Sequence, residues 1–197
     1  FSGVGKRRDE ILEALRAGVK CFNVESEAEL RRIHAVATES GLRAPVSLRV
    51  NPDVDAKSHP YISTGLKENK FGIGHEEAIR LYHEASQLSG LEVIGIDCHI
   101  GSQITEMSPF LAALEKLLEL IENLHAAGIR LKHLDLGGGL GIRYVDETPP
   151  SAAEFMRAIV ERLDAHPLAR DMELVFEFGR ALVGNAGLLL TRLEYLK

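Results

Sequence analysis

Apolar residues along the chain fall into short continuous runs that alternate with longer stretches of helical spacing. Short runs rich in apolar and β-branched residues, bounded by polar or glycine-rich turns, are typical of buried strands. The clearest run is residues 91–98, Leu-Glu-Val-Ile-Gly-Ile-Asp-Cys. With four similar runs it predicts five strands, at residues 19–25, 46–50, 91–98, 133–136 and 173–178.

The stretches between these runs place apolar side chains every three or four residues, which predicts amphipathic helices. The strongest stripe extends from Phe110 to Leu124 and ends at Gly128. It begins at Ser108 and Pro109, a capping residue followed by proline at the first helical position. The predicted helices lie at about residues 8–17, 26–41, 76–88, 108–128 and 151–165.

Two helix starts carry a further signal. Ser26 with Glu29, and Ser151 with Glu154, have the spacing of a capping box. In this motif the serine side chain accepts a hydrogen bond from the backbone N–H three residues on, and the glutamate side chain accepts one from the serine N–H. We expect both boxes to form.

Residues 53–70 form a long polar segment without clear periodicity. A connection of this length inside a compact domain is usually functional or mobile. Lys67 and Lys70 lie within it and would either contact a substrate or stay solvated, and solvation is the favoured interpretation for Lys67.

Strand and helix alternate about five times, mostly with short connections. This order predicts parallel strands joined by right-handed crossovers, and therefore an α/β fold. An open doubly wound sheet and part of a (β/α)₈ barrel both fit, and both bind ligands at the carboxyl ends of their strands. A complete barrel has eight strands and typically about 250 residues, so a barrel made by this chain would be partial. The abrupt start, Phe-Ser-Gly-Val, also suggests a fragment.

The composition of the chain argues against a membrane-spanning protein and against a nucleic-acid-binding protein. The chain has 197 residues, of which 45% are hydrophobic, and this is ample for one buried core. It has no run of about 18 apolar residues, so no membrane span is expected. The formal net charge is −6 and no block of lysine and arginine stands out, so nucleic acid is not an expected partner.

Cysteine and histidine give no metal signature. Cys21 and Cys98 lie in apolar, strand-like runs without the spacing of metal ligands, which predicts reduced, buried core residues of a cytoplasmic protein. The histidines are scattered, with no His-Glu-x-x-His or comparable motif, so no metal site is predicted.

Three of the predicted strands end in chemically capable groups. Residues 99–103 (His-Ile-Gly-Ser-Gln), 137–141 (Gly-Gly-Gly-Leu-Gly) and 177–180 (Glu-Phe-Gly-Arg) each follow a strand. The carboxyl ends of parallel strands lie at one edge of a sheet. We therefore expect the three segments to converge on one phosphate-bearing cofactor.

The first two segments can supply groups for a phosphate and a planar ring. The glycines let backbone N–H groups approach an anion closely, although the spacing matches neither the P-loop nor the Rossmann motif, and a simple tight turn is the alternative. Ser102 lacks the surroundings of a hydrolase nucleophile and suits a hydroxyl contact to phosphate better. His99 offers a flat ring for stacking, or is a hydrogen-bonded structural residue.

The third segment carries opposite charges. A carboxylate such as Glu177 at the end of an apolar strand needs a partner, and a protonated ring nitrogen would be suitable. Arg180 can hold a phosphate or carboxylate through two parallel hydrogen bonds. The alternative is a Glu177–Arg180 ion pair that only stabilises the strand end.

These three motifs together resemble those of the pyridoxal 5'-phosphate (PLP)-dependent decarboxylases of the alanine-racemase-like barrel group, and within it most closely the diaminopimelate decarboxylases. The likeness covers nearly the whole chain and is specific as a combination. Further matching segments lie at residues 22–30, 49–55 and 59–72.

The resemblance implies a partial (β/α)₈ TIM barrel of about five βα units. Residues 1–186 would form the C-terminal part of the PLP-binding barrel, and residues 187–197 would begin the connection to a β domain. In the family, the lysine that binds the cofactor covalently lies on an earlier strand, which would be upstream of Phe1. We therefore expect this chain alone to be inactive.

The resemblance also implies roles for individual residues. His99 would stack on the cofactor ring, and Glu177 would keep the pyridine nitrogen protonated, which makes these two the catalytic residues. Ser102, Gly139 and Gly179 would lie around the phosphate together with Arg180, which also approaches the substrate. The full set of expected cofactor-binding residues is His99, Ser102, Gly138, Gly139, Glu177, Phe178, Gly179 and Arg180.

The implied activity is decarboxylation of meso-2,6-diaminopimelate to L-lysine by a homodimer that shares its active sites. Two alternatives stay open: another decarboxylase of the group, acting on ornithine, arginine or carboxynorspermidine, and a non-catalytic PLP-binding barrel fragment. The chain departs from the family at Phe178, where the family usually has proline.

Overall fold

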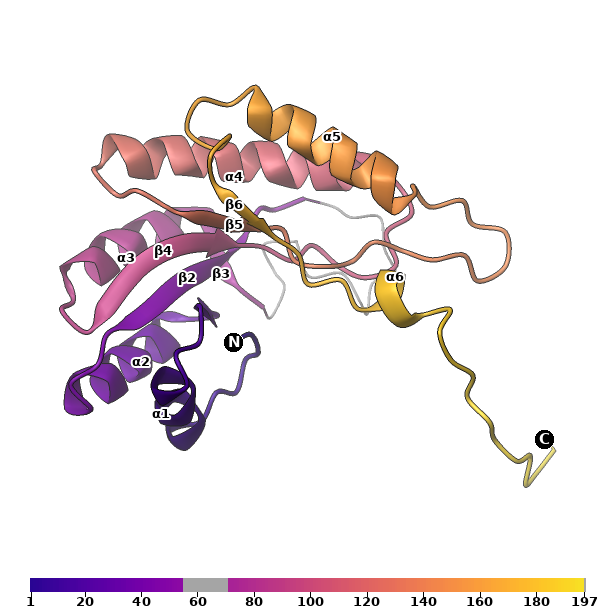
Figure 1. Cartoon of the computed structure of the whole chain (residues 1–197), viewed down its shortest axis with the longest axis horizontal. Helices are drawn as coiled ribbons and strands as arrows, with labels where there is room; N and C mark the ends of the chain where they lie inside the picture. Colours follow the sequence, from indigo (N-terminus) through magenta and orange to yellow (C-terminus); the bar gives the residue numbers. More distant parts are fainter. Residues whose placement is uncertain (55–70, 197) are drawn as a thin grey trace.

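The computed structural model describes residues 1–54 and 71–196, and within them a parallel β-sheet curves through the molecule (Figure 1). Its strand order follows the order of the sequence, and β3 pairs with β2 beside this path. A doubly wound sheet reverses its strand order at a switch point, whereas a barrel does not. The observed order therefore favours the barrel. The strands are β1 (Phe22–Val24), β2 (Ala44–Asn51), β3 (Ile73–Gly74), β4 (Leu91–Asp97), β5 (His133–Asp135) and β6 (Glu173–Val175).

Helices follow the strands in the predicted alternation. Figure 1 shows them as an arc around the sheet, from α1 and α2 at the bottom of the view to α5 at the top. The short β3 and α6 are additions that the sequence pattern did not predict. The helices are α1 (Arg8–Arg16), α2 (Glu27–Glu39), α3 (His75–Gln87), α4 (Ser108–Ala126), α5 (Ala152–Asp164) and α6 (Arg180–Val183).

Of the three helix caps predicted from the sequence, the one at α5 forms in full. At α5 the capping box forms: Glu154 N–H donates to Ser151 Oγ at 3.2 Å, and Ser151 N–H donates to Glu154 Oε2 at 2.9 Å. At α4 the predicted cap is wrong, because Ser108 is itself the first helical residue and Met107 precedes it as cap. Local sequence signals thus locate a helix start to within a residue or two.

The box predicted at α2 forms only in part. Ser26 Oγ accepts a hydrogen bond from Glu29 N–H at 3.3 Å, as expected. The Glu29 carboxylate, however, accepts from Glu25 N–H at 2.7 Å and pairs with Lys6 Nζ at 2.6 Å. A buried lysine therefore competes successfully for the carboxylate that the box would have used.

Lys6 is 3% exposed, which is unusual for a lysine. Its three ammonium donors are all used, on the carbonyls of Gly3 and Asn23 and on Glu29 Oε1. A buried charge is tolerated when it is paired and hydrogen-bonded in this way. Lys6 thus joins the N-terminal segment to β1 and α2.

Tyr82 of α3 reaches into the sheet where β2 and β4 change register, between Val46 and Ser47. Its hydroxyl accepts from Leu48 N–H at 3.3 Å and donates to the carbonyl of Gly95 at 2.8 Å. The irregular register leaves these two backbone groups available, and the buried tyrosine satisfies both.

The core lies between the sheet and the inner faces of the helices. Cys21 and Cys98 are buried in it, and both thiols are free in the part of the chain that the structure describes. Burial raises the pKa of the Cys21 thiol to about 12, and it raises the pKa of Cys98 strongly as well. Both cysteines therefore stay protonated and act as apolar core residues, as predicted.

Residues 187–196 extend away from the rest of the molecule (Figure 1). No strand forms among them; an extended segment needs a neighbouring strand to pair with, and none lies beside it in the described part of the chain. Leu188 and Leu190 are consequently 95% and 92% exposed. None of the helices within residues 1–54 and 71–196 has the length and apolar character needed to cross a membrane.

Candidate functional site

A pocket of about 490 Å³ lies at the carboxyl ends of β4, β5 and β6. Six of the eight residues predicted to bind the cofactor line it, namely His99, Ser102, Gly139, Glu177, Gly179 and Arg180. They come from the three segments that the sequence pattern expected to converge. The structure thus brings the three strand ends together on one side of the sheet.

The glycine segment packs closely against both neighbouring segments. Gly137 and Gly139 have φ values of 64° and 103°, which side chains rarely tolerate. A Cβ atom on Gly138 would lie 2.4 Å from the carbonyl oxygen of Glu177, and one on Gly139 would lie 2.3 Å from that of Gly101. Only glycine therefore allows the three strand ends to approach with backbone against backbone.

His99 lies just beyond the carboxyl end of β4, and a hydrogen bond holds its ring in place. Its Nδ1 accepts a hydrogen bond from Gly138 N–H at 3.1 Å, so this nitrogen carries no proton. Burial, assisted by the nearby Arg49 charge, lowers the pKa of His99. The ring is therefore a neutral imidazole at neutral pH, held by the loop that also contains Gly139.

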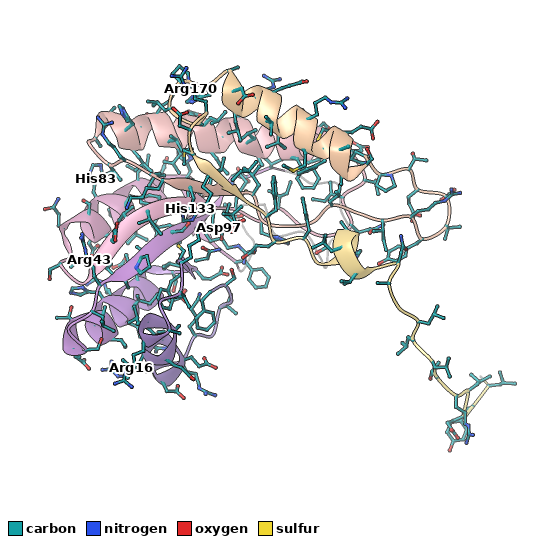
Figure 2. The ribbon with its side chains drawn as sticks, viewed as in Figure 1. Arg16, Arg43, His83, Asp97, His133 and Arg170 are labelled. Atoms are coloured by element: carbon teal, nitrogen blue, oxygen red, sulfur yellow. The ribbon has the colours of Figure 1, made fainter. Side chains whose placement is uncertain are left out.

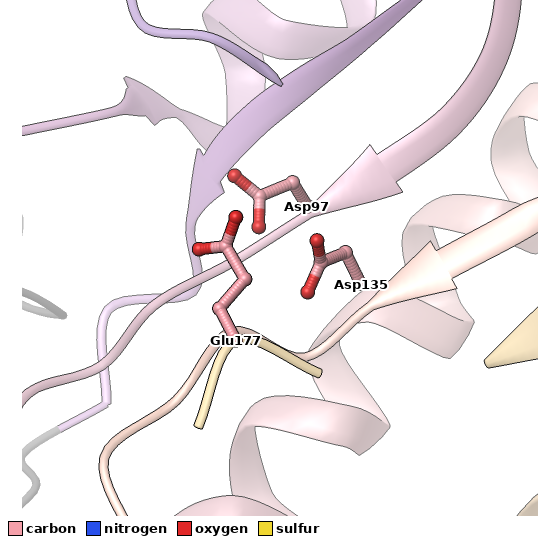
Figure 3. A group of neighbouring side chains, drawn as sticks. All are labelled: Asp97, Asp135 and Glu177. Atoms are coloured by element: carbon pink, nitrogen blue, oxygen red, sulfur yellow. The ribbon is translucent and has the colours of Figure 1, made fainter. Parts of the chain in front are cut away.

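Three carboxyl groups face one another beside the pocket, as Figure 3 shows for Asp97, Asp135 and Glu177. One oxygen of each lies within 4.8 Å of the others, a spacing that could also hold a metal ion. Asp97 is 2% exposed, and its Oδ1 has no hydrogen-bond partner among the described residues. Figure 2 labels Asp97 together with His133, which lies on the neighbouring strand β5.

Burial and the neighbouring carboxyl groups disfavour ionisation of the two aspartates. The pKa of Asp97 rises well above its usual value, first through burial and then through the charges of Asp135 and Glu177. Burial likewise raises the pKa of Asp135 to about 6, although the N–H of Gly137 donates to its Oδ1 at 2.8 Å. A positive charge beside the three carboxyl groups would relieve both effects.

Glu177 also has partners on β1 and the N-terminal segment. It accepts one hydrogen bond from the hydroxyl of Ser2 and another from Asn23 Nδ2 at 3.4 Å. The same Asn23 amide donates to Asp135 Oδ2 at 3.3 Å. These contacts connect β1 to the ends of β5 and β6 across the curved sheet.

Arg180 begins α6 and points its guanidinium along the pocket wall. Its Nη1 donates to Gln103 Oε1 at 3.2 Å, and its Cζ lies 5.7 Å from the centre of the Tyr144 ring. Arg180 and Glu177 both belong to the described part of the chain, and they form no ion pair with each other. The alternative interpretation of these two residues as a strand-end ion pair is therefore wrong.

Two predicted residues, Gly138 and Phe178, lie beside the pocket without lining it. The Phe178 ring stacks on Phe176 with centroids 4.9 Å apart and meets the edge of Phe155 of α5 at 5.4 Å. Aromatic packing against a helix thus fixes residues 177–180 where a proline would have restricted the backbone.

Some residues of the site were not predicted from the sequence, and some residues singled out in the sequence lie outside the part of the chain that the structure describes. Asp97, Asp135, Gln103 and Tyr144 contribute to the site although they were not predicted to. An acidic residue inside an otherwise apolar strand was the available signal for the two aspartates, the same signal that drew attention to Glu177. Lys67, Lys70 and most of the matching segment 59–72 lie outside the described residues.

Comparison with known proteins agrees with this geometry. A family model described as "Pyridoxal-dependent decarboxylase, pyridoxal binding domain" matches residues 1–184. The diaminopimelate decarboxylases of Pseudomonas aeruginosa and Vibrio cholerae are 64% and 56% identical to the chain over 197 residues, which are 46% of each protein. The chain thus spans about half the length of the curated relatives it matches.

A solved structure extends the comparison to the fold. The crystal structure of diaminopimelate decarboxylase from Helicobacter pylori, complexed with L-lysine, superimposes with a TM-score of 0.86 at 39% identity. The match covers 91% of this chain and 45% of that one. It confirms the predicted fold, part of an α/β barrel, and the chain belongs to the pyridoxal-dependent decarboxylases, whose cofactor is pyridoxal 5'-phosphate.

Proposed function

We propose that the protein containing this chain decarboxylates meso-2,6-diaminopimelate to L-lysine with pyridoxal 5'-phosphate as cofactor. One observation carries the proposal: Glu177, a neutral histidine and an arginine line one pocket at three adjacent strand ends, and two further carboxyl groups lie beside Glu177. This is the set of groups that a cationic ring bearing a phosphate requires. High identity to diaminopimelate decarboxylases supports the substrate.

The residues of the pocket fit this cofactor on physical grounds. The buried Asp97 oxygen without a partner and the neighbouring carboxyl groups call for a positive charge, which a protonated ring nitrogen supplies. Glu177, the most exposed of the three carboxyl groups, would hold that nitrogen. Ser102, Gly139, Gly179 and Arg180 would surround the phosphate, and Gly138 and Phe178 would hold the loops that carry them.

Each residue then has a defined task. The bound cofactor supplies a cationic ring that withdraws electrons from the substrate α-carbon, which favours loss of carbon dioxide. Glu177 would keep a proton on the ring nitrogen, and this maintains the positive charge. His99 would cover one face of the ring and exclude water from it. Arg180 would neutralise phosphate and lie close enough to meet a substrate carboxylate.

The alternative substrates are those of the other basic amino-acid decarboxylases. A lysine decarboxylase from Selenomonas ruminantium has the same fold, with a TM-score of 0.75, at 25% identity. This is far below the 64% identity to a diaminopimelate decarboxylase, so diaminopimelate is the favoured substrate. Measuring carbon dioxide release from diaminopimelate, ornithine, arginine and carboxynorspermidine tests this choice.

Substitution of Glu177 tests the proposed chemistry. In the whole protein, Glu177→Ala should lower turnover by orders of magnitude, since the ring nitrogen would lose its ionic partner. Glu173→Ala is the matched control, because Glu173 begins β6, the strand that leads to Glu177, and pairs with the exposed Lys20. Turnover near the wild-type rate in Glu177→Ala would contradict the assigned role.

The assembly and location of the protein are part of the proposal. We infer a cytoplasmic homodimer with shared active sites, as the resemblance implies. Two buried free thiols, Cys21 and Cys98, support a reducing compartment. Sedimentation of the whole protein tests the dimer, and activity recovered on mixing two inactive variants with defects in different parts of the site tests the sharing.

A further inference from the structure

Gln103 is a pocket residue that none of the roles proposed above explains. Its side-chain amide makes two hydrogen bonds with the backbone of Ile142: Nε2 donates to the carbonyl at 2.5 Å, and Oε1 accepts from the N–H at 3.1 Å. One bond needs a donor and the other an acceptor, so the orientation of the amide is determined. The side chain pairs with Ile142 as a neighbouring peptide group would.

These bonds complete a pairing between two segments of the site. Ile104 N–H donates to the carbonyl of Gly139 at 2.9 Å, and Gly141 N–H donates to the carbonyl of Ile104 at 3.0 Å. Residues 101–104 and 139–142 thus form a parallel pair, which we call the clasp, and Gln103 closes it through Ile142. Ser102 and Gly139, on opposite sides of the clasp, both line the pocket.

The amide oxygen that accepts from Ile142 also accepts from Arg180 Nη1, at 3.2 Å. On another side the guanidinium lies 5.7 Å from the centre of the Tyr144 ring. A guanidinium has five N–H donors, so the bond to Gln103 leaves donors for an anion. Gln103 therefore connects the clasp to the cation that lines the same pocket.

Gln103 has an unfavourable backbone conformation, which the contacts of its side chain stabilise. Its φ is 56°, in the left-handed region, where a side chain is unfavourable and glycine is preferred. Within the described ranges, only Asp53 among other non-glycine residues has a positive φ. Residues persist in this conformation when surrounding contacts outweigh the cost, and the three hydrogen bonds of Gln103 are such contacts.

We propose that Gln103 is a positioning residue that closes the clasp and aims Arg180 at the phosphate of pyridoxal 5'-phosphate. The inference rests on the proposed function for the identity of the anion. It adds a residue that acts through Arg180 and the clasp.

Two variants of the whole protein separate the side chain from its backbone conformation. Gln103→Leu removes all three hydrogen bonds and keeps the unfavourable φ, whereas Gln103→Gly removes them and relieves it. Gln87→Leu is the matched control, since Gln87 is an exposed glutamine in the last turn of α3. Dissociation constants are measured for pyridoxal 5'-phosphate and for pyridoxal, which lacks the phosphate.

Both Gln103 variants should bind pyridoxal 5'-phosphate about tenfold more weakly, while their affinity for pyridoxal changes less than twofold. The ³¹P resonance of the bound phosphate should also shift in both variants and not in Gln87→Leu. A general structural role would weaken both ligands equally and would not single out the phosphate.

Three results would overturn the inference. These are wild-type affinity for pyridoxal 5'-phosphate in Gln103→Gly, an equal loss for both ligands, and an unchanged ³¹P resonance. Should Gln103→Leu fail to fold, Gln103→Gly decides, because glycine suits the backbone at this position. A wild-type protein that binds neither ligand would refute the proposed function itself, and wild-type binding with unaffected variants would refute only the role of Gln103.

Discussion

At the scale of single residues, the buried carboxyl groups dominate the energetics of the site. Asp97 and Asp135 are 2% and 3% exposed, and Glu177 adds a third carboxyl group within 4.8 Å. Proteins rarely bury such a group without a cation or a proton to neutralise it. The raised pKa values of the two aspartates show the second of these solutions, since each shift favours the protonated form.

The raised pKa of Asp135 predicts a pH-dependent stability without cofactor. Its carboxyl pKa is about 6 when folded, against a usual value near 3.8. Its stabilising contribution is thus complete below pH 3.8 and is lost as the pH rises through 6. The loss amounts to about 3 kcal/mol in total, at roughly 1.4 kcal/mol for each pH unit between the two values.

Asp135→Asn should remove this dependence while Gly137 N–H keeps its acceptor. Urea unfolding at several values between pH 4 and pH 7 gives the free energy of unfolding of both proteins. The stability of the wild type relative to the variant should fall as the pH rises. Parallel pH profiles for the two proteins would show that Asp135 does not titrate in this range.

The sequence could predict those residues whose place depends only on following a visible strand. His99, Ser102, Glu177 and Arg180 are of this kind, and the pocket contains all four. Lys6 is the opposite case, since no local pattern marks this lysine for burial. Its burial depends on acceptors from Gly3, Asn23 and Glu29, which only the tertiary fold brings together.

At the scale of elements, helix α3 and the sheet are joined by a polar contact inside the core. Tyr82→Phe would leave Leu48 N–H and the carbonyl of Gly95 buried without partners. We expect the free energy of unfolding to fall by about 2 kcal/mol, the usual cost of unsatisfied buried backbone groups. Urea unfolding measures the loss.

Tyr195→Phe is the matched control for this substitution, because Tyr195 is 90% exposed and should tolerate loss of its hydroxyl. Equal stability of Tyr82→Phe and the wild type would mean that water or a shift of the strands replaces the hydroxyl.

Element prediction succeeded where periodicity extends over several turns and failed in short pieces. The five long helices and five main strands lie where the pattern placed them, with shifts of a few residues at their ends. Strand β3 and helix α6 have two and four residues, too few for a period to appear. The Glu29 side chain of α2 pairs with Lys6 and does not complete the predicted capping box. No pattern in the neighbouring sequence indicates this contact.

At the scale of the whole molecule, the cofactor would bridge the ends of three strands. Pyridoxal 5'-phosphate at 100 times its dissociation constant should add roughly 2.7 kcal/mol to stability by mass action. For a chain of this size we expect the melting temperature to rise by about 5 °C or more. Thermal unfolding with and without cofactor tests this.

The rise should be smaller in Glu177→Gln, where a neutral amide replaces the partner of the ring nitrogen, and should persist in Glu173→Gln. An identical rise in Glu177→Gln would indicate that the ring nitrogen has another partner.

Alternation of strand and helix established the α/β class but could not separate a barrel from a doubly wound sheet. That choice depends on which strand lies beside which, and hence on contacts between residues far apart in sequence. Asn23 of β1 and Glu177 after β6 are separated by 154 positions and yet share a hydrogen bond. No local pattern encodes such a contact.

Phe178 packs on Phe155, a residue of an outer helix. A mutation on the far side of α5 can therefore disturb ligand affinity without touching the ligand, because any tilt of that helix carries the anchoring ring with it. Substitutions on the outer surface of α5 would in this way change the affinity for pyridoxal 5'-phosphate although they lie far from its binding site.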